Sequence, residues 1–333
     1  MIDEPPLLEV DNLQTFFHTR GGTVKAANGV SFALGRGEIT GLVGESGSGK
    51  SVTAFSIMRL VKPPGQIVGG RVLLNGDDLL SKSDDEMRSI RGRSISMIFQ
   101  DPANFLDPLF TAGQAITEAM QIHQDVGRVE ARDAAIQLLG QLKVPTPETV
   151  VDAYPFQLSG GMCQRVLIAT AMASKPALLI ADEATSALDV TVQASILRTL
   201  QELRDMSDTT VLLTTHNMQV VRKVCSRTMV MYSGLIMESG PTREVLEYPL
   251  HPYTAGLLSC VPTLDRLGQA LASIPGEPPI PGSVEKGCVF YSRCPIRRPV
   301  CAEEQPPLEE IAPGHFSACP FLQETNGTAP TTC

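Results

Sequence analysis

Residues 44–51 read Gly-Glu-Ser-Gly-Ser-Gly-Lys-Ser, which fits the G-x-x-x-x-G-K-[ST] pattern of a phosphate-binding loop. The apolar segment Ile39–Val43 predicts a strand before it, and a helix is expected from about Ser51. Glycines let the loop curl so that its N–H groups point at phosphate oxygens, with the positive end of the helix behind them. Lys50 is expected to reach the β- and γ-phosphates, and Ser51 to bind Mg²⁺. The predicted nucleoside triphosphate site comprises Gly44, Glu45, Ser46, Gly47, Ser48, Gly49, Lys50 and Ser51.

Two adjacent acids, Asp182 and Glu183, end the apolar run Leu178–Ala181. Such a run predicts a buried parallel strand whose carboxyl end faces bound metal and phosphate. We therefore expect Asp182 to hold Mg²⁺ and Glu183 to polarise the attacking water. Upstream, residues 158–165 read Leu-Ser-Gly-Gly-Met-Cys-Gln-Arg and precede a stretch rich in Ala, Ile and Met that is expected to be helical.

These three segments occur in the order and spacing of the ATP-binding cassette (ABC) ATPases, which the chain resembles. The resemblance implies an α/β fold, the ABC-type P-loop ATPase, with a RecA-like core, an antiparallel β subdomain and a helical signature subdomain. It implies that Gln100, after the expected strand Ile95–Phe99, contacts Mg²⁺ or the lytic water. His216, after the expected strand Val211–Thr215, would contact the γ-phosphate and orient Glu183. The resemblance adds further nucleotide-binding residues: Asp182, Ser159, Gly160, Gly161, Gln164 and Asp189.

The Ser-Gly-Gly segment, Ser159–Gly161, combines a hydroxyl with unhindered N–H groups at an expected helix start, which is an anion site. The phosphate loop already binds this chain's own nucleotide, so the signature must serve the ATP of another subunit. In the family, two cassettes sandwich two nucleotides head to tail. Asp189 ends the segment Ser186–Asp189, which resembles the D-loop that crosses between subunits.

The family's adenine-stacking aromatic lies shortly before the strand that leads to the phosphate loop. Phe17 is the expected residue and Phe16 its competitor, although an aromatic here could equally be core packing. Two positions depart from the family pattern: Ala184 stands where Pro is usual, and Asn217 replaces the Asp that commonly follows the switch histidine. Neither change removes a catalytic group, so we expect hydrolytic competence.

The length of 333 residues, 43% of them hydrophobic, suits one large or two modest domains. Residues 7–245 are expected to form the nucleotide-binding domain, with a helical subdomain over about 101–170. One expected helix face in that subdomain carries Ala131, Ala135, Leu138, Leu139 and Leu142. Composition then shifts to Pro-rich loops, which predicts a small extension over 246–322 and a disordered tail over 323–333.

No apolar run approaches the ~20 residues that cross a bilayer. The N-terminus lacks the basic and apolar regions of a secretory signal, so the chain is expected to stay in the cytoplasm. The formal net charge of −9 argues against a nucleic-acid partner, since such proteins normally carry a basic stripe.

Cysteines are unevenly distributed, and the C-terminal region holds a cluster spaced C-x5-C-x6-C-x17-C. Its members are Cys288, Cys294, Cys301 and Cys319. In a reducing compartment such a cluster suggests metal more than disulfides, and either Zn²⁺ or a [4Fe–4S] cluster could hold a small Pro-rich domain together. Spacing alone does not decide between them. The other cysteines are expected to be ordinary thiols: Cys163, Cys225, Cys260 and Cys333.

Features outside the universal motifs resemble the ATPases of dipeptide/oligopeptide importers. Residues 100–108 resemble their Q-loop extension, and residues 154–157 resemble their Tyr-Pro-His-Gln with Phe156 for His. Residues 251–258 match their His-Pro-Tyr-Thr segment, and the cysteine pattern of the extension matches as well. The resemblance spans essentially residues 7–321 and favours the [4Fe–4S] cluster over zinc or over thiols without metal.

The resemblance implies a peripheral subunit on the cytoplasmic face of the inner membrane that powers peptide import. Its implied partners are a second, homologous but non-identical cassette, two permeases and, indirectly, an extracytoplasmic solute-binding protein. Nickel and glutathione importers share much of the extension and stay open as alternatives. An ABC ATPase of iron–sulfur assembly is the alternative from a different class, although it would not need the His-Pro-Tyr-Thr segment. A DNA-repair or translation-factor ABC protein would carry a long insertion between the phosphate loop and the signature.

Overall fold

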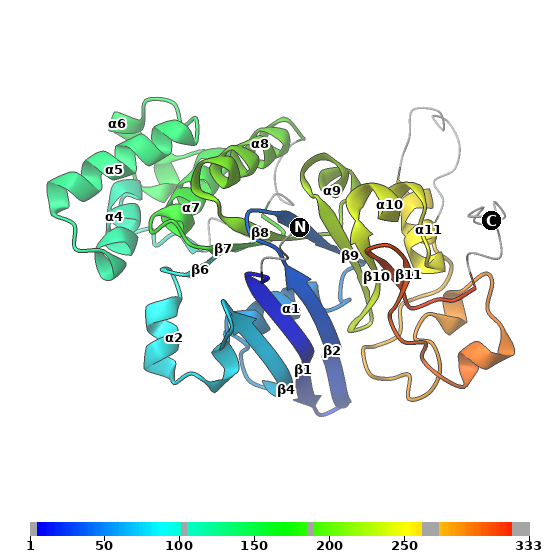
Figure 1. Ribbon diagram of the computed structural model, residues 1–333. Helices are drawn as coiled ribbons and strands as arrows, with labels where there is room; N and C mark the ends of the chain where they lie inside the picture. Colours follow the sequence, from blue (N-terminus) through cyan, green and yellow to red (C-terminus); the bar gives the residue numbers. More distant parts are fainter. Residues whose placement is uncertain (1–4, 101–104, 185–189, 262–272, 322–333) are drawn as a thin grey trace. The chain divides into compact units, whose positions relative to one another are not determined.

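The computed structural model describes residues 5–100, 105–184, 190–261 and 273–321 (Figure 1). These residues form two compact units. Unit 1 takes its residues from the ranges 1–7, 34–38 and 81–214, and unit 2 from 8–33, 39–80 and 215–333. Within the described ranges, the helices are too short or too polar to span a bilayer.

Unit 1 is built on a parallel sheet with the strand order β8–β7–β6, in which Leu178 of β7 pairs with Ile95 on one side and Thr210 on the other. The strands are β6 (Ile95–Ile98), β7 (Leu178–Asp182) and β8 (Thr210–Thr215). Every residue of these strands is buried, as continuous apolar runs in a parallel sheet require. The helices and 3-10 turns of this unit are α2 (Asp84–Ile90), α4 (Ala112–His123), α5 (Arg128–Gln141), α6 (Pro147–Val150), η2 (Pro155–Gln157), α7 (Gly160–Met172) and α8 (Val190–Ser207). The 3-10 turn η1 (Leu79–Ser81) begins in unit 2 and ends at the first residue of the range 81–214.

Helices α4 to α7 gather in the part of unit 1 where helical periodicity was expected (Figure 1). On α5 the predicted apolar face is buried at Ala131, Ala135 and Leu139, whereas Leu138 is half-buried. A capping box begins α4, because the Thr111 hydroxyl and the Gln114 side chain each bond the other residue's backbone N–H. Local sequence therefore specifies both the start and the packed side of these helices.

Unit 2 contains two sheets. The first is antiparallel, with the order β2–β1–β4–β5, and Val10 of β1 faces Val72 of β4. Its strands are β1 (Leu8–Thr19), β2 (Gly22–Leu34), β4 (Gly65–Leu74) and β5 (Asp77–Asp78). The second has the order β3–β9–β10–β12–β11, with β3 and β9 parallel and the later pairs antiparallel. Its strands are β3 (Ile39–Val43), β9 (Arg227–Tyr232), β10 (Leu235–Pro241), β11 (Glu309–Ala312) and β12 (His315–Ser317). The helices and 3-10 turns are α1 (Lys50–Ile57), α9 (Met218–Val224), α10 (Thr242–Glu247), α11 (Pro252–Ser259), η4 (Tyr291–Arg293) and η5 (Pro299–Ala302).

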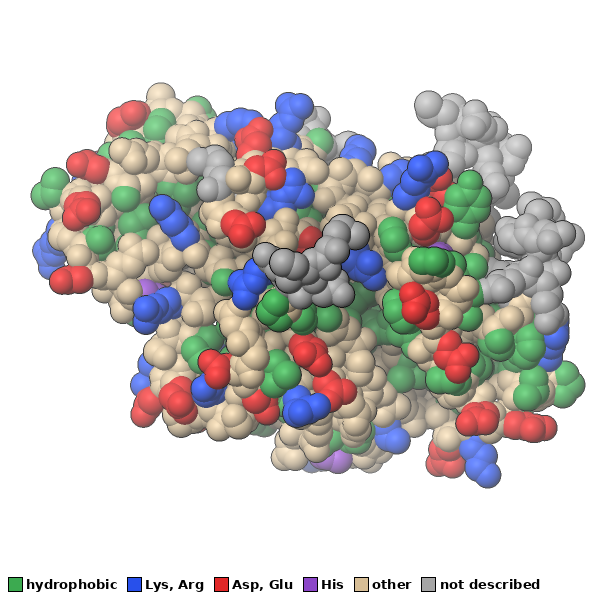
Figure 2. Space-filling model, viewed as in Figure 1, with side chains coloured by type: hydrophobic (Ala, Val, Ile, Leu, Met, Phe, Trp, Pro, Cys, Tyr) green, Lys and Arg blue, Asp and Glu red, His purple; other side chains and the backbone are tan. Residues whose placement is uncertain are grey.

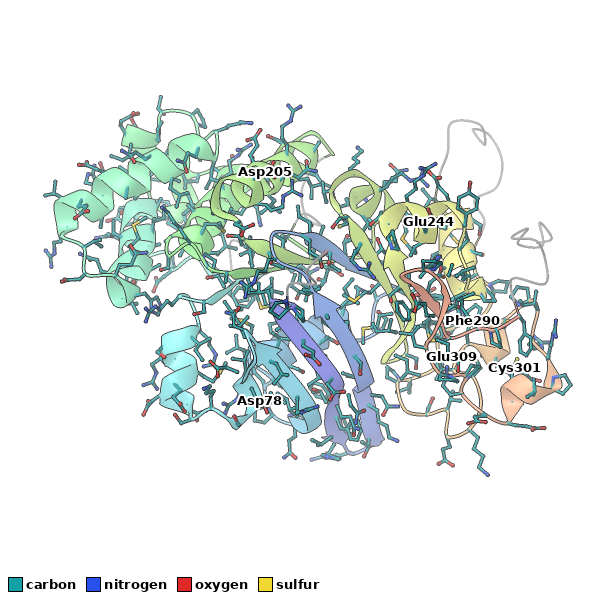
Figure 3. All side chains as sticks on the ribbon, viewed as in Figure 1. Asp78, Asp205, Glu244, Phe290, Cys301 and Glu309 are labelled. Carbon is teal, nitrogen blue, oxygen red and sulfur yellow. The ribbon has the colours of Figure 1, made fainter. Side chains whose placement is uncertain are left out.

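The C-terminal segment packs into the core of unit 2. Strand β12 pairs with β10, and Phe290 meets the rings of Tyr232 and Tyr253, each at a centroid distance of 5.4 Å (Figure 3). The buried Glu238 of β10 pairs with His315 of β12, with 2.8 Å between carboxylate Oε1 and imidazole Nε2. This segment is therefore folded by strand pairing and aromatic packing against the rest of its unit.

On the face seen in Figure 2, acidic and basic side chains of the described residues are interspersed. They form no continuous basic patch on that face.

We expect the free energy of unfolding to fall as the pH drops below about 6.5, in part because of His251. This residue caps α11, and its Nδ1 accepts a hydrogen bond from the backbone N–H of Tyr253 at 3.0 Å. Burial lowers the pKa of His251 from 6.5 to about 3. Between these two pKa values the unfolded chain binds a proton at His251 that the folded chain does not bind. The free energy of unfolding therefore decreases as the pH falls through this range, by at most about 1.4 kcal/mol per pH unit for this one group.

The matched variant is His251→Asn, because asparagine also caps a helix but does not titrate in this range. Urea unfolding of both proteins between pH 7 and pH 4 should show a shallower loss of stability in the variant. Equal slopes would assign the acid sensitivity to other groups.

Candidate active site

The phosphate loop connects β3 to α1 within unit 2. All five residues of β3 are buried, so the strand fixes where the loop begins. Gly49 has a φ of 109°, which residues with side chains rarely adopt, and a Cβ atom there would overlap the carbonyl oxygen of Ala26. Gly44 and Gly47 also have positive φ angles. The glycine pattern is therefore required by the shape of the backbone.

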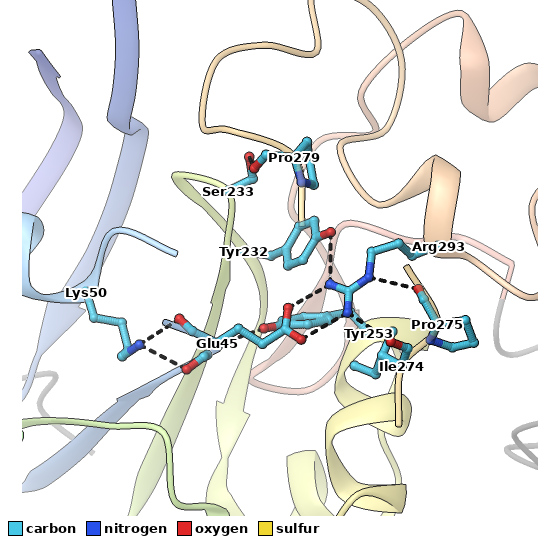
Figure 4. Close-up of polar contacts among 10 residues, drawn as sticks. Glu45, Lys50, Tyr232, Ser233, Tyr253, Ile274, Pro275, Pro279 and Arg293 are labelled. Atoms are coloured by element: carbon cyan, nitrogen blue, oxygen red, sulfur yellow. Dashed lines mark hydrogen bonds and ion pairs between the residues drawn. The ribbon is translucent and has the colours of Figure 1, made fainter. Parts of the chain in front are cut away.

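Lys50 lies inside this loop and is 4% exposed. Its Nζ donates hydrogen bonds to the carbonyl oxygens of Gly44 and Glu45, both at 2.9 Å (Figure 4). An ammonium held in this way is a preplaced cation beside a row of curled backbone N–H groups. The residues of the loop therefore fit a nucleotide phosphate chain.

Two residues from the C-terminal part of unit 2 also reach the loop. Arg293 pairs with the Glu45 carboxylate, and the Tyr253 hydroxyl accepts a hydrogen bond from the Glu45 N–H at 2.9 Å (Figure 4). Sequence reasoning assigned neither residue to the site. Tyr253 stands in the His-Pro-Tyr-Thr segment, which offered a signal, whereas nothing around Arg293 pointed to the loop.

The acid pair lies in unit 1 at the end of β7. Asp182 is 4% exposed, and its Oδ1 accepts a hydrogen bond from the Thr214 hydroxyl at 2.5 Å. Glu183 Oε2 accepts one from Nε2 of Gln100 at 3.2 Å. The structure thus brings together two of the three residues expected to handle the lytic water.

Glu183 has a φ of 46°, in the left-handed region that residues other than glycine seldom occupy. Its N–H donates to the backbone oxygen and to the hydroxyl of Thr214, both at 3.1 Å, which hold this conformation. Backbone strain maintained by surrounding contacts is common at functional sites. Ala184, where the family usually has Pro, is buried at 2% exposure.

The signature begins α7, a helix of 13 residues in unit 1. Ser159 is its N-cap, and its hydroxyl accepts a hydrogen bond from the N–H of Met162 at 3.3 Å. Ser159 and Gly160 are exposed, so the helix start faces outward. Gln164 is 1% exposed, and its Nε2 has no hydrogen-bond partner among the described residues. Its expected contact with nucleotide stays a prediction.

His216 follows β8 and is exposed. It belongs to unit 2, whereas Glu183 belongs to unit 1, and its role as the switch histidine stays a prediction. The next residue, Asn217, caps α9, because its side-chain oxygen accepts hydrogen bonds from the N–H groups of Gln219 and Val220. The Asn that replaces the family's Asp therefore supplies the same kind of cap.

Phe16 and Phe17 are neighbours on β1, so their side chains lie on opposite faces of the sheet. Lys25 Nζ lies 5.7 Å from the ring centroid of Phe16. Phe17 faces Gly65 across the strand pair, and a Cβ atom at Gly65 would overlap its ring. Both rings are half-buried, and the choice of Phe17 for adenine stacking stays a prediction.

Some expected site residues lie outside the described residues. They are Asp189 with the D-loop segment 186–189, residues 101–104 of the Q-loop extension, and the tail over 323–333.

The four clustered cysteines line one cavity of about 20 Å³ together with His251 and Phe290. Burial raises the pKa of the Cys288 thiol and of the Cys294 thiol to about 11. Both thiols are therefore protonated at neutral pH. Cys301, labelled in Figure 3, contacts Cys288 through a backbone hydrogen bond of 2.7 Å between its carbonyl oxygen and the Cys288 N–H.

Two family models match the chain. The model for ABC transporters matches residues 27–186, and the model for the C-terminal region of oligopeptide/dipeptide transporters matches residues 237–301. A probable peptide ABC transporter ATP-binding protein of Sinorhizobium fredii is 46% identical over 94% of each chain. An oligopeptide transport ATP-binding protein of Escherichia coli is 44% identical over 94% of this chain and 92% of its own.

Solved structures agree with these matches. A dimeric bacterial ABC transporter cassette superimposes with a TM-score of 0.64 at 28% identity, over 71% of this chain and 99% of that one. The same cassette has been solved in a post-hydrolysis state with ADP and phosphate. The chain belongs to the ATP-binding proteins of ABC transporters, in the group with the oligopeptide/dipeptide transporter C-terminal region. It is an ATP-binding, ABC-type ATPase with the cassette fold.

The prediction of a [4Fe–4S] cluster at Cys288, Cys294, Cys301 and Cys319 is wrong. In the described part of the chain, which includes all four cysteines, no group of three or more His, Cys, Asp or Glu side chains is placed to hold a metal ion. The relatives are named as peptide transport ATPases, and the role in iron–sulfur assembly is not supported either. The physical error was to assume that the C-terminal segment lacks a core, because it packs on β10 and on Tyr232.

Proposed function

We propose that this chain hydrolyses ATP to power the import of di- and oligopeptides through a membrane ABC transporter. One observation carries the proposal: a phosphate loop, an acid pair and a signature occur in one chain with the C-terminal region of oligopeptide/dipeptide transporters. The names of the relatives, which are peptide and oligopeptide transport ATP-binding proteins, support peptides as the solute over nickel or glutathione.

Residues 44–51 would bind the phosphates, with Lys50 at the β- and γ-phosphates. Mg²⁺ would neutralise part of the phosphate charge when bound, and we propose Ser51, Gln100 and Asp182 to hold it. Glu183 would accept a proton from the lytic water, while Gln100 and His216 orient the reacting groups. The contact of 3.2 Å between Gln100 and Glu183 supports this pairing of roles. Water would then attack the γ-phosphorus, and ADP would leave.

Ser159, Gly160 and Gly161 would bind the γ-phosphate of ATP held by a second cassette. The exposed start of α7 supports this role, since a 13-residue helix presents its free N–H groups there. We propose that Gln164 and Asp189 support the same interface. The second cassette would be homologous to this chain and not identical to it.

The remaining partners would be two permeases and, indirectly, an extracytoplasmic solute-binding protein, with this chain peripheral at the cytoplasmic face of the inner membrane. The division into a nucleotide-binding domain over 7–245, an extension over 246–322 and a tail over 323–333 is part of the same proposal. The extension would be rich in cysteine without being a metal domain.

We propose that permeases dock on unit 1 beside Gln100. Three apolar side chains there are exposed: Phe105 at 49%, Leu109 at 79% and Phe110 at 42%. Phe105 also stacks on Phe99 with 3.9 Å between ring centroids, which links this surface to the strand that ends at Gln100. A group of exposed apolar side chains of this kind marks a protein interface.

The proposal is tested with the chain reconstituted in proteoliposomes with its second cassette and permeases. ATP hydrolysis is measured with the solute-binding protein loaded in turn with oligopeptides, Ni²⁺ or glutathione. Peptides are expected to stimulate hydrolysis. Stimulation by Ni²⁺ or glutathione and not by peptides would contradict the proposed solute.

In the same assay, Leu109→Asp should abolish stimulation by solute, because a charge at the centre of the apolar surface must be desolvated on docking. The matched control is Ile122→Asp, which changes another exposed apolar residue of unit 1, 66% exposed at the other end of α4. The control should keep its stimulation. If both variants kept or both lost the stimulation by solute, the permeases would not dock on the surface formed by Phe105, Leu109 and Phe110.

A further inference from the structure

Arg293 of η4 makes an ion pair with Glu45, the second residue of the phosphate loop, although 248 positions separate them in the chain. Nη1 lies 2.7 Å from Oε2 and Nη2 lies 3.0 Å from Oε1, so the contact is bidentate (Figure 4). The Arg293 side chain is 4% exposed and that of Glu45 is 28% exposed. The pair is thus largely buried, and an arginine–carboxylate contact is stronger when it is shielded from water.

The guanidinium of Arg293 is fixed on every side. Beyond Glu45, Nη1 donates to the Tyr232 hydroxyl at 3.2 Å, Nη2 to the Ile274 carbonyl oxygen at 3.2 Å and Nε to the Pro275 carbonyl oxygen at 3.1 Å. These bonds and the two to Glu45 use all five N–H donors of the side chain. The pKa of Arg293 is raised, chiefly by its hydrogen bonds to Glu45, so its charge is permanent.

Glu45 is held at its other polar groups as well. Its N–H donates to the Tyr253 hydroxyl at 2.9 Å, and its carbonyl oxygen accepts from Lys50 Nζ at 2.9 Å. Tyr253 is fully buried, with its ring centroid 4.5 Å from that of Tyr232. The C-terminal segment and the phosphate-binding lysine therefore hold the same loop residue from two sides.

The charge of Glu45 is unfavourable for the task of the loop. A carboxylate in a phosphate-binding loop repels the anionic nucleotide, and the repulsion is strong where water is excluded. Arg293 cancels that charge and directs the carboxylate toward the C-terminal segment. Hydrogen bonds at Tyr253 and Lys50 then set the direction of the Glu45 peptide groups.

We propose that Arg293 is a positioning residue for ATP binding, through which the C-terminal segment neutralises Glu45 and holds the phosphate loop in its binding shape. The inference rests on the proposed role of residues 44–51 as the ATP site. ATP affinity then depends on a segment that follows all of the predicted nucleotide-binding residues in the chain.

The test compares four full-length variants by calorimetric titration with ATP. They are Arg293→Met, Glu45→Gln, the double variant, and Arg297→Met as a control for the loss of an exposed arginine in the same segment. Arg293→Met should raise the dissociation constant for ATP about tenfold. The double variant should return it to within about threefold of Glu45→Gln alone, because the unpaired carboxylate is gone. Arg297→Met should bind as the wild type does.

Rescue by Glu45→Gln separates this inference from a structural role of Arg293. A dissociation constant unchanged in Arg293→Met, or one that is equally high in the double variant, would overturn the inference. If Arg293→Met does not fold, Arg293→Lys replaces it in the test. Its dissociation constant for ATP should be raised about threefold at low salt, and adding Glu45→Gln should reverse this increase. Equal affinity in Arg293→Lys and wild type would overturn it as well. Failure of the wild type to bind ATP would instead refute the proposed site.

Discussion

Replacing Glu183 with glutamine is expected to lower the turnover of ATP roughly 10²- to 10⁴-fold while ATP binding survives. Glutamine has the shape of glutamate and can keep the contact with Gln100, which is 3.2 Å long in the structure. Its amide cannot accept the proton of the lytic water. Single-turnover hydrolysis and equilibrium ATP binding, measured on the same protein, check the two parts of the expectation.

The reference variant is Lys50→Ala, which removes the ammonium bonded to the carbonyl oxygens of Gly44 and Glu45. This change should weaken ATP binding itself and lower hydrolysis for that reason. Near-normal turnover of ATP in Glu183→Gln would show that Glu183 is not the catalytic base. Loss of binding in both variants would mean that Glu183 acts on the nucleotide and not on water.

The second large effect is expected from Ser159→Arg. The side chain of Ser159 is exposed at the start of α7, so an arginine there leaves the fold of this chain intact but blocks the approach of a second cassette. ATP binding by this chain should be unchanged, whereas hydrolysis in the assembled pair should fall by at least roughly two orders of magnitude. Hydrolysis is measured as a function of protein concentration, because a reaction completed by two subunits depends on their association.

Ser89→Arg is the matched control, since Ser89 is an exposed serine on α2 of the same unit. It adds the same charge and size away from the signature and should hydrolyse ATP as the wild type does. Full activity of Ser159→Arg, or activity of the wild-type chain that does not change with concentration, would contradict a site shared between subunits.

Much of the fold could be predicted because the elements that carry the site are locally encoded. The apolar run at 39–43 is the buried strand β3, and the run that ends at Asp182 is the buried strand β7. Periodicity placed α5 correctly through Ala131 and Ala135. The strands β1 and β2, of 12 and 13 residues, were expected through the resemblance, which implied an antiparallel β subdomain without its bounds.

The rest could not be predicted because it depends on contacts between distant parts of the chain. No local pattern relates Arg293 to Glu45, since a salt bridge leaves no periodicity in either segment. The prediction of a metal cluster at the four cysteines was wrong for a different reason. Their spacing did indicate that they converge, but sequence does not show that the segment has a core of its own, which it gains by packing on β10 and on Tyr232.

The hairpin of β11 and β12 has a consequence for any shortened form of the protein. In the intact chain β12 covers the outer side of β10, pairing Ser317 with Glu238 and Phe316 with Ser239. A fragment that stops at residue 245 would leave the N–H and C=O groups of that side without partners. Uncovered strands of this kind pair with other molecules and aggregate. We therefore expect a fragment that ends at residue 245 to aggregate more readily than the longer chain, because β10 then lacks its partner strand.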